Sequence, residues 1–338
     1  MSILQAALQL SYYGPIVLFS IGTPAALLNA IIFMGIKTLR QSSTSYYVLG
    51  QSLADMSVLL AVLLQAIPST SMFASSITCK LSMFFLQSTS CLAMNFLCLA
   101  AFDRWVCTSQ LVRIRQWSSC RIARRLFPLP FLIWPLVNIP FLIYCDLVSP
   151  TYTCWFTSRL FEQIANYFLD PMLAFVFPLC ILIAFGLLTC RNIRRVTHIR
   201  QQPTQTHSPM WEQQMTRMIV TQTLCSIICA LPRAMFVMYM AATVEGDAKK
   251  SFDQISIELL VNQLSAIILC VNFSSTFFIF IFVSPRLRET IKIHLKRLFN
   301  LRRNQIGATN ISLMGPRIIT RQTERENVNP AMAIEHVG

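Results

Sequence analysis

The sequence has few charged residues: Asp, Glu, Lys and Arg make up 12% of its 338 residues, whereas hydrophobic residues make up 54%. A soluble domain carries about twice that charged fraction. The composition therefore excludes an ordinary soluble globular protein and indicates insertion into a membrane.

Histidine and glycine are scarce as well. The four histidines, His198, His207, His294 and His336, lie in polar connections or near the C-terminus. No cluster of His, Cys and carboxylate residues falls within an apolar stretch, which disfavours a metal centre or an acid–base active site. Nine glycines are too few for the broken, glycine-rich helices of many transporters. We therefore expect no enzyme, and a transporter or channel is only a distant alternative.

Seven apolar stretches are long enough to cross a bilayer, which takes about 20 residues of helix. They cover roughly residues 13–36, 46–68, 79–102, 122–144, 164–190, 215–242 and 257–283. We predict an all-α membrane protein, a seven-transmembrane helix bundle within residues 1–299. Residues 300–338 are polar and mix Arg with Asn, Gln and Thr, which predicts a disordered cytoplasmic tail.

The basic residues indicate the orientation of the bundle. Of 28 Lys and Arg, only Lys80, Arg159, Lys249 and Lys250 lie in the connections on one side of the predicted membrane. Because cytoplasmic loops collect Lys and Arg, we predict the N-terminus outside and the C-terminus inside. This topology and the anionic lipid of the inner leaflet explain the net charge of +14. Nucleic-acid binding is not expected.

The segment after the seventh stretch has a helical apolar pattern. In RLRETIKIHLKRLF, the apolar residues Leu287, Ile291, Leu295 and Leu298 recur every three or four positions, with Arg and Lys opposite them. This pattern predicts an amphipathic helix over about 285–299 that lies on the inner membrane surface and contacts lipid.

The third stretch ends in an acid beside a base, Asp103 and Arg104. An ionisable residue near membrane depth is costly and indicates a functional site, although an arginine that only anchors the helix end is the alternative. Cys79 begins the same stretch, about 37 Å away along a helix, and thus on the outer, oxidising side. The next outer connection offers two partners for a disulfide, Cys145 and Cys154.

Polar residues and prolines interrupt other stretches. Asn29 and Asp55 lie in the middle of the first and second stretches, where polar groups need internal partners. Pro178 and Pro232 lie within the fifth and sixth. Proline kinks a membrane helix, which provides either a hinge or a packing solution.

Taken in order along the chain, these residues resemble the rhodopsin-like (class A) G-protein-coupled receptors. The matching markers are Asn29, the segment SLADMSVLL with Asp55, Cys79 and Cys154, the sequence DRW at Asp103–Trp105, Trp134, Pro178 and Pro232. The end of the seventh stretch looks most like invertebrate FMRFamide-type peptide receptors. The resemblance implies a multi-pass plasma-membrane receptor with a Cys79–Cys154 disulfide, and hinges at the two prolines.

The resemblance also implies two partners, an extracellular ligand and a heterotrimeric G protein. We expect a neuropeptide ligand, with a chemosensory role for small molecules as the alternative. The outer half of the bundle is the expected pocket, with Met83, Leu86, Gln87, Ser90, Asp170 and Arg233. Leu86 stands where amine receptors carry aspartate, which disfavours an amine ligand. Arg233 needs a partner, for which Asp170 and a ligand anion are the two candidates.

The remaining implied roles concern switching. Arg104, paired with Asp103 and Glu212, is expected to hold spans three and six together until span six moves outward. A solvated Glu212 is the alternative. Asp55 is expected either to bind a sodium ion, the only cofactor considered, or to act as a protonated polar hub. Its expected neighbours are Asn29, Asn272 and Thr276, with Ser275 as a further candidate.

Three departures from the family pattern are visible. Residues Thr276–Phe280 replace the N-P-x-x-Y motif, Ala230 stands in place of the tryptophan before Pro232, and Gly186 stands in place of a tyrosine after Pro178. The family's usual toggle and tyrosine pair are absent, so the resemblance leaves open whether the family's standard switching route carries over to this chain.

Overall fold

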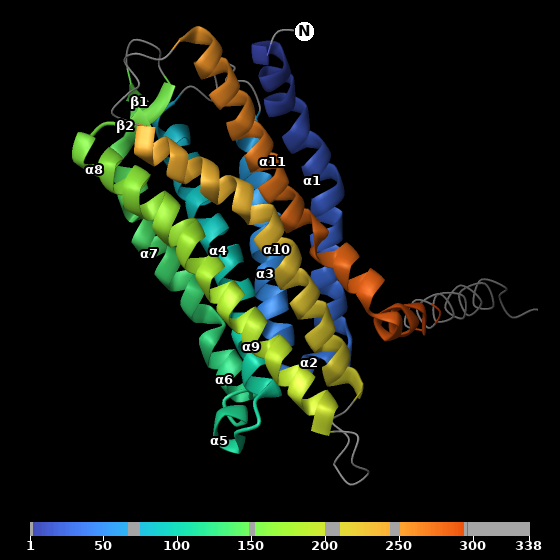
Figure 1. The fold of residues 1–338 in the computed structure, drawn as a ribbon. Coiled ribbons are helices and arrows are strands. Elements are labelled where there is room, and N and C mark those ends of the chain that lie inside the picture. The colour runs from blue at the N-terminus through green and yellow to red at the C-terminus, as the bar shows by residue number, and fades with distance from the viewer. Residues whose placement is uncertain are drawn as a thin grey trace, which may run out of the picture. The chain divides into compact units, whose positions relative to one another are not determined.

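The structure is a computed structural model that describes residues 3–66, 75–148, 153–199, 210–243, 251–293 and 296 (Figure 1). The chain divides into two units, residues up to Leu287 and residues from Arg288 onward, and the bundle belongs to the first. The predicted tail, 300–338, lies outside the described residues.

The first unit is almost entirely helical. Its elements are α1 (Ile3–Gly35), α2 (Lys37–Arg40), α3 (Ser43–Ala66), α4 (Ser76–Thr108), α5 (Val112–Arg115), α6 (Cys120–Leu126), α7 (Pro128–Tyr144), β1 (Cys145–Val148), β2 (Thr153–Phe156), α8 (Arg159–Ile164), the π-helix η1 (Ala165–Val176), α9 (Phe177–Ile199), α10 (Met210–Thr243) and α11 (Phe252–Val283). Within the described residues, seven helical segments are long and apolar enough to span a membrane. The predicted seven-helix fold is therefore confirmed.

Several helices begin where a serine side chain replaces a missing helical hydrogen bond. Ser75, Ser119, Ser158 and Ser251 each accept a hydrogen bond from the backbone N–H three residues later. Such caps satisfy N–H groups that the first turn leaves without a partner.

Prolines break the regularity of the fourth and fifth spans. Pro128 starts α7 directly after Phe127, so the fourth span is divided into α6 and α7. The fifth span contains the π-helix η1, and Pro171 lies inside it. Proline has no N–H and clashes with the carbonyl four residues earlier, which disrupts regular α-helix. Pro178, a predicted hinge, lies in α9, two residues after η1 ends.

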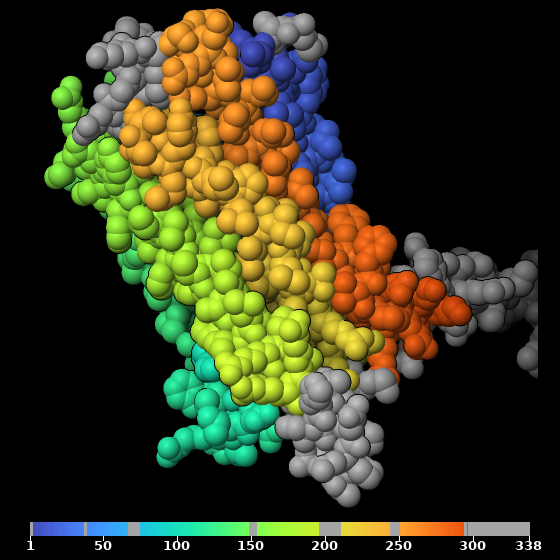
Figure 2. Space-filling view, viewed as in Figure 1, coloured from blue at the N-terminus to red at the C-terminus, as the bar shows by residue number. Residues whose placement is uncertain are grey.

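Helix α4 packs against more of the long helices than α1 does. Helix α1 packs on α3 and α11, α3 packs on α4, and α4 also contacts α7 and α9. Helix α10 lies between α9 and α11 along the face shown in Figure 2. Close approach of α3 and α4 depends on Gly50, because a methyl group there would lie 2.5 to 2.7 Å from atoms of the Phe96 ring.

The antiparallel hairpin of β1 and β2, which was not predicted, covers one end of the bundle. After α11, residues 285–293 are helical and Leu287 is buried. Leu295 and Leu298, two members of the predicted amphipathic face, lie outside the described residues.

Candidate functional site

The hairpin is attached to the bundle by a disulfide between Cys79 of α4 and Cys154 of β2, whose Cα atoms are 5.5 Å apart. The alternative partner, Cys145, is a buried free cysteine. Burial raises the pKa of the Cys145 thiol to about 11, so it rarely forms the thiolate that disulfide exchange requires. An ion pair of 3.2 Å between Lys80 and Asp146 further joins α4 to β1.

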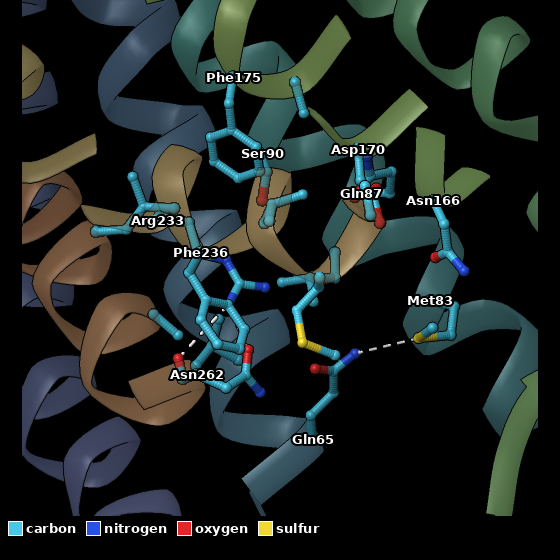
Figure 3. Close-up of a pocket in the computed structure, with 18 of the residues that line it drawn as sticks. Gln65, Met83, Gln87, Ser90, Asn166, Asp170, Phe175, Arg233, Phe236 and Asn262 are labelled. Carbon is cyan, nitrogen blue, oxygen red and sulfur yellow. Dashed lines mark hydrogen bonds between the residues drawn. The ribbon is translucent and has the colours of Figure 1, made fainter. Parts of the chain in front are cut away.

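A cavity of about 660 Å³ lies beneath the hairpin (Figure 3). Its volume is within the range of small-molecule and cofactor sites. Most of the lining side chains are apolar, and Trp155 and Phe156 of β2 contribute to its wall. All six residues predicted for the pocket line it: Met83, Leu86, Gln87, Ser90, Asp170 and Arg233. The π-helix η1 contributes the predicted Asp170 together with Asn166 and Phe175, which were not predicted.

The predicted ion pair between Arg233 and Asp170 does not form among the described residues. Arg233 Nη1 instead donates to Asn262 Oδ1 of α11 at 2.5 Å, as Figure 3 shows. The guanidinium also lies 5.9 Å from the centre of the Phe236 ring. The sequence analysis missed Asn262, although an isolated amide in the apolar run ELLVNQL was a usable signal.

Deeper in the bundle, Asp55 lies beside Thr276. Thr276 Oγ1 donates to Asp55 Oδ2 at 3.3 Å and accepts a hydrogen bond of 3.1 Å from Gln222 Nε2. The other two predicted hub residues bond elsewhere: Asn29 donates to Ser52, and Asn272 accepts from Ser226. Asp55 Oδ1 and Gln222 Oε1 are buried without a hydrogen-bond partner. Oxygen atoms of this kind suit a hard cation, and an acceptor without a partner equally suits a carboxyl proton.

Several of these contacts belong to one row of polar pairs between α10 and α11, which we call the α10–α11 ladder. Its four pairs, from the cavity to the opposite end, are Arg233–Asn262 (2.5 Å), Ser226–Asn272 (2.6 Å), Gln222–Thr276 (3.1 Å) and Gln214–Ser284 (3.4 Å). The signal that would have revealed three of them is helical spacing: Gln222, Ser226 and Arg233 are four and seven residues apart, which places them on one face of α10.

At the end opposite the hairpin, Asp103 and Arg104 form a buried ion pair of 2.7 Å. The Asp103 carboxylate also accepts hydrogen bonds of 2.5 to 2.7 Å from three hydroxyls. They belong to Ser43 and Thr44 of α3 and to Ser118, which precedes α6. These hydroxyl residues were not predicted, although the run SSTS at 42–45 places several hydroxyls at one helix start.

The predicted contact between Arg104 and Glu212 is absent from this arrangement. Glu212 is exposed, and within the described residues Arg104 forms an ion pair with Asp103 alone. The Arg104 guanidinium points toward Asp103 because the three hydroxyls hold the Asp103 carboxylate beside it. Two guanidinium nitrogens, Nε and Nη1, are left buried without a hydrogen-bond partner. Spans three and six are therefore not joined by an ion pair at this end.

The geometry thus consists of a ligand-sized cavity at one end of seven membrane-spanning helices, a buried ion pair at the other and a polar row between them. No curated protein matches the chain, and the finer resemblance to FMRFamide-type peptide receptors stays a prediction. The family described as "7 transmembrane receptor (rhodopsin family)" matches residues 27–278. This match covers most of the chain and includes Asp55, Arg104 and Arg233. The chain therefore belongs to the rhodopsin family of seven-transmembrane receptors and is a multi-pass protein of the plasma membrane.

Proposed function

We propose that this G-protein-coupled receptor binds an extracellular peptide in the cavity beneath the hairpin and activates a heterotrimeric G protein at the Asp103–Arg104 end. Membership of the rhodopsin family implies an extracellular ligand and G-protein coupling. The observation that carries the proposal is the α10–α11 ladder, because its first pair lies in the cavity and its last near the other end.

The ladder supplies a route for activation that does not need the missing family residues. For span six to swing outward from span seven, the polar pairs between α10 and α11 must separate. Each buried hydrogen bond contributes about 0.5–1.5 kcal/mol, so three or four together bias the closed state by a few kcal/mol. This is the size of typical coupling energies between sites. A ligand that disturbs the pair Arg233–Asn262 therefore favours the open state.

A peptide is favoured over an uncharged odorant by the polar groups in the cavity. Arg233 and Asp170 both line it, and an apolar ligand would desolvate both charged groups without giving either of them an oppositely charged partner. A peptide offers charged and amide groups for them. The chemosensory alternative predicts a response to neutral small molecules that does not depend on either residue.

At Asp55 we propose a polar hub that holds either a proton or a sodium ion. The support is the two buried oxygens without partners, Asp55 Oδ1 and Gln222 Oε1. A bound sodium ion would supply positive charge to the Asp55 carboxylate.

The test is nucleotide exchange on purified G proteins by wild-type receptor and Arg104→Ala, compared at equal surface expression. We expect the basal signal of the wild type to be lost in Arg104→Ala and retained in Arg113→Ala, a control at an exposed arginine of α5. If the wild type is silent, the comparison is made in a Gln222→Leu background, which opens the ladder. Equal signals with and without Arg104 would contradict coupling at this end.

A further inference from the structure

The cavity contains two opposite charges that do not pair with each other. Within the described residues the ion pairs are Lys80–Asp146 and Asp103–Arg104, and both lie outside the cavity lining. Arg233 and Asp170 therefore face one cavity from α10 and η1 and attract each other across it without forming an ion pair (Figure 3). A charge at such depth is costly unless a partner neutralises it.

The other carboxylates of the cavity wall already have hydrogen-bond donors from the protein. Glu162 accepts from Trp155 Nε1 at 3.1 Å, and Glu258 accepts from the Tyr239 hydroxyl at 2.9 Å. Asp170 interacts with the neutral amide of Gln87. All three acids therefore have neutral donors, but Trp155 and Tyr239, the donors of Glu162 and Glu258, are exposed side chains that water reaches as well. Asp170 is the lining acid whose charge has the greater need of a cation from a ligand.

Arg233 retains donors for a ligand. The hydrogen bonds of its guanidinium to the described residues come from Nη1 alone, and both go to neutral oxygens of Asn262. Its Nε and Nη2 have no such bond, and neither is sealed from the cavity as the free nitrogens of Arg104 are. The N–H groups of Nε and Nη2 form one edge of the planar guanidinium, and this edge matches a carboxylate, which it binds with two parallel hydrogen bonds.

We propose that the receptor recognises an amphoteric ligand, one that places an anionic group, such as a carboxylate, on Arg233 and a cationic group on Asp170. This inference rests on the proposed function and names the chemistry of its ligand. An anion bound at Nε and Nη2 pulls the guanidinium toward the cavity and so weakens its Nη1 hydrogen bond to Asn262, the first pair of the α10–α11 ladder. Arg233 then both binds the ligand and controls the ladder.

The experiment measures binding without a G protein, on the full chain in lipid nanodiscs. Three probes share one phenyl ring and chain: 3-phenylpropionate, its neutral amide, and 3-phenylpropylamine. We expect the wild type to bind the carboxylate and the amine at least about tenfold more tightly than the amide, since a charge-assisted hydrogen bond is stronger than one between neutral groups. Arg233→Gln should lose the preference for the carboxylate and keep that for the amine. Asp170→Asn should do the reverse.

Arg233→Lys is the matched control, because it keeps the positive charge and should keep part of the preference. A wild type that binds carboxylate and amide equally, or neither, overturns the anion site, and this comparison needs no variant to fold. A preference that survives in Arg233→Gln overturns the assignment to that residue. Because this experiment measures binding and not signalling, its outcomes could still be interpreted if Arg104→Ala signalled like the wild type and so contradicted the proposed coupling.

Discussion

The carboxylate of Asp103 is the best-satisfied charge in the interior of the bundle. It receives three hydroxyl hydrogen bonds and one from Arg104. Arg104, by contrast, is 2% exposed and has two nitrogens without a partner. A buried pair of this kind contributes little net stability, but removal of one partner leaves a costly uncompensated charge. Asp103 therefore determines where the Arg104 side chain lies.

Replacement of Asp103 by asparagine should raise basal G-protein activation. The amide keeps the shape but loses the charge that holds the guanidinium, so Arg104 is released. Glu212→Gln should leave the basal signal near that of the wild type, because Glu212 is exposed and unpaired with Arg104. Nucleotide exchange at matched surface expression measures both. An equal rise in the two variants would instead support the lock between spans three and six that the family resemblance implies.

At the scale of elements, the contact between α10 and α11 differs from an ordinary apolar helix interface. Gln222 and Ser226 are fully buried, and each hydrogen-bonds a residue of the facing helix. In a membrane, polar side chains between helices hold them together, since lipid offers no competing partner. The position of span six relative to span seven is consequently set by a few hydrogen bonds.

Weakening this ladder should favour the open state. We expect Gln222→Leu to raise basal signalling by several-fold, since one lost hydrogen bond of about 1 kcal/mol shifts a two-state equilibrium by that factor. Combining it with Thr276→Val should add little, because both changes remove the same contact. Ile228→Ala, at a side chain 69% exposed on the same helix, is the control. A decrease in signalling would mean that the ladder belongs to the active state.

The contact between α3 and α4 depends on the absence of a side chain at Gly50. Gly50→Ala should lower the free energy of unfolding by about 1–3 kcal/mol, because the buried Phe96 ring has no room to move aside. Gly186→Ala is the matched control, since the nearest atom to its added methyl group, in Thr223, lies 3.5 Å away. Thermal unfolding in detergent measures both. Equal melting temperatures for the two variants would show that α3 and α4 adjust freely.

At the scale of the whole molecule, one covalent bond joins residues 75 positions apart and fixes the hairpin over the cavity. Cys154→Ala should cost about 2–5 kcal/mol of stability and weaken binding of the charged probes. Cys145→Ala should have a smaller effect, because Cys145 makes no disulfide. Melting temperatures with and without reductant provide the measurement. If complete reduction left the melting temperature of the wild type unchanged, the Cys79–Cys154 disulfide would not stabilise the fold as expected.

Much of the architecture was predictable from the sequence. Hydropathy located seven spans because a membrane helix satisfies its own backbone hydrogen bonds, so that length and composition of each segment suffice. Helical spacing placed Met83, Gln87 and Ser90 on one face of α4, and they line the cavity. The irregular part of the fifth span was harder to predict, since the sequence pattern gave no reason to expect the irregularity at Pro171 and not at Pro178.

The partners of the charged side chains were decided only by the tertiary structure. Arg233 bonds Asn262 rather than Asp170, and Arg104 bonds Asp103 rather than Glu212. Each choice depends on how far neighbouring helices are rotated and shifted relative to one another, and the packing of residues far apart in the chain sets those values. The sequence by itself determined which groups lie inside the membrane and need partners. Which partner each group has follows from distances across the bundle, because hydrogen bonds and ion pairs act over only a few ångströms.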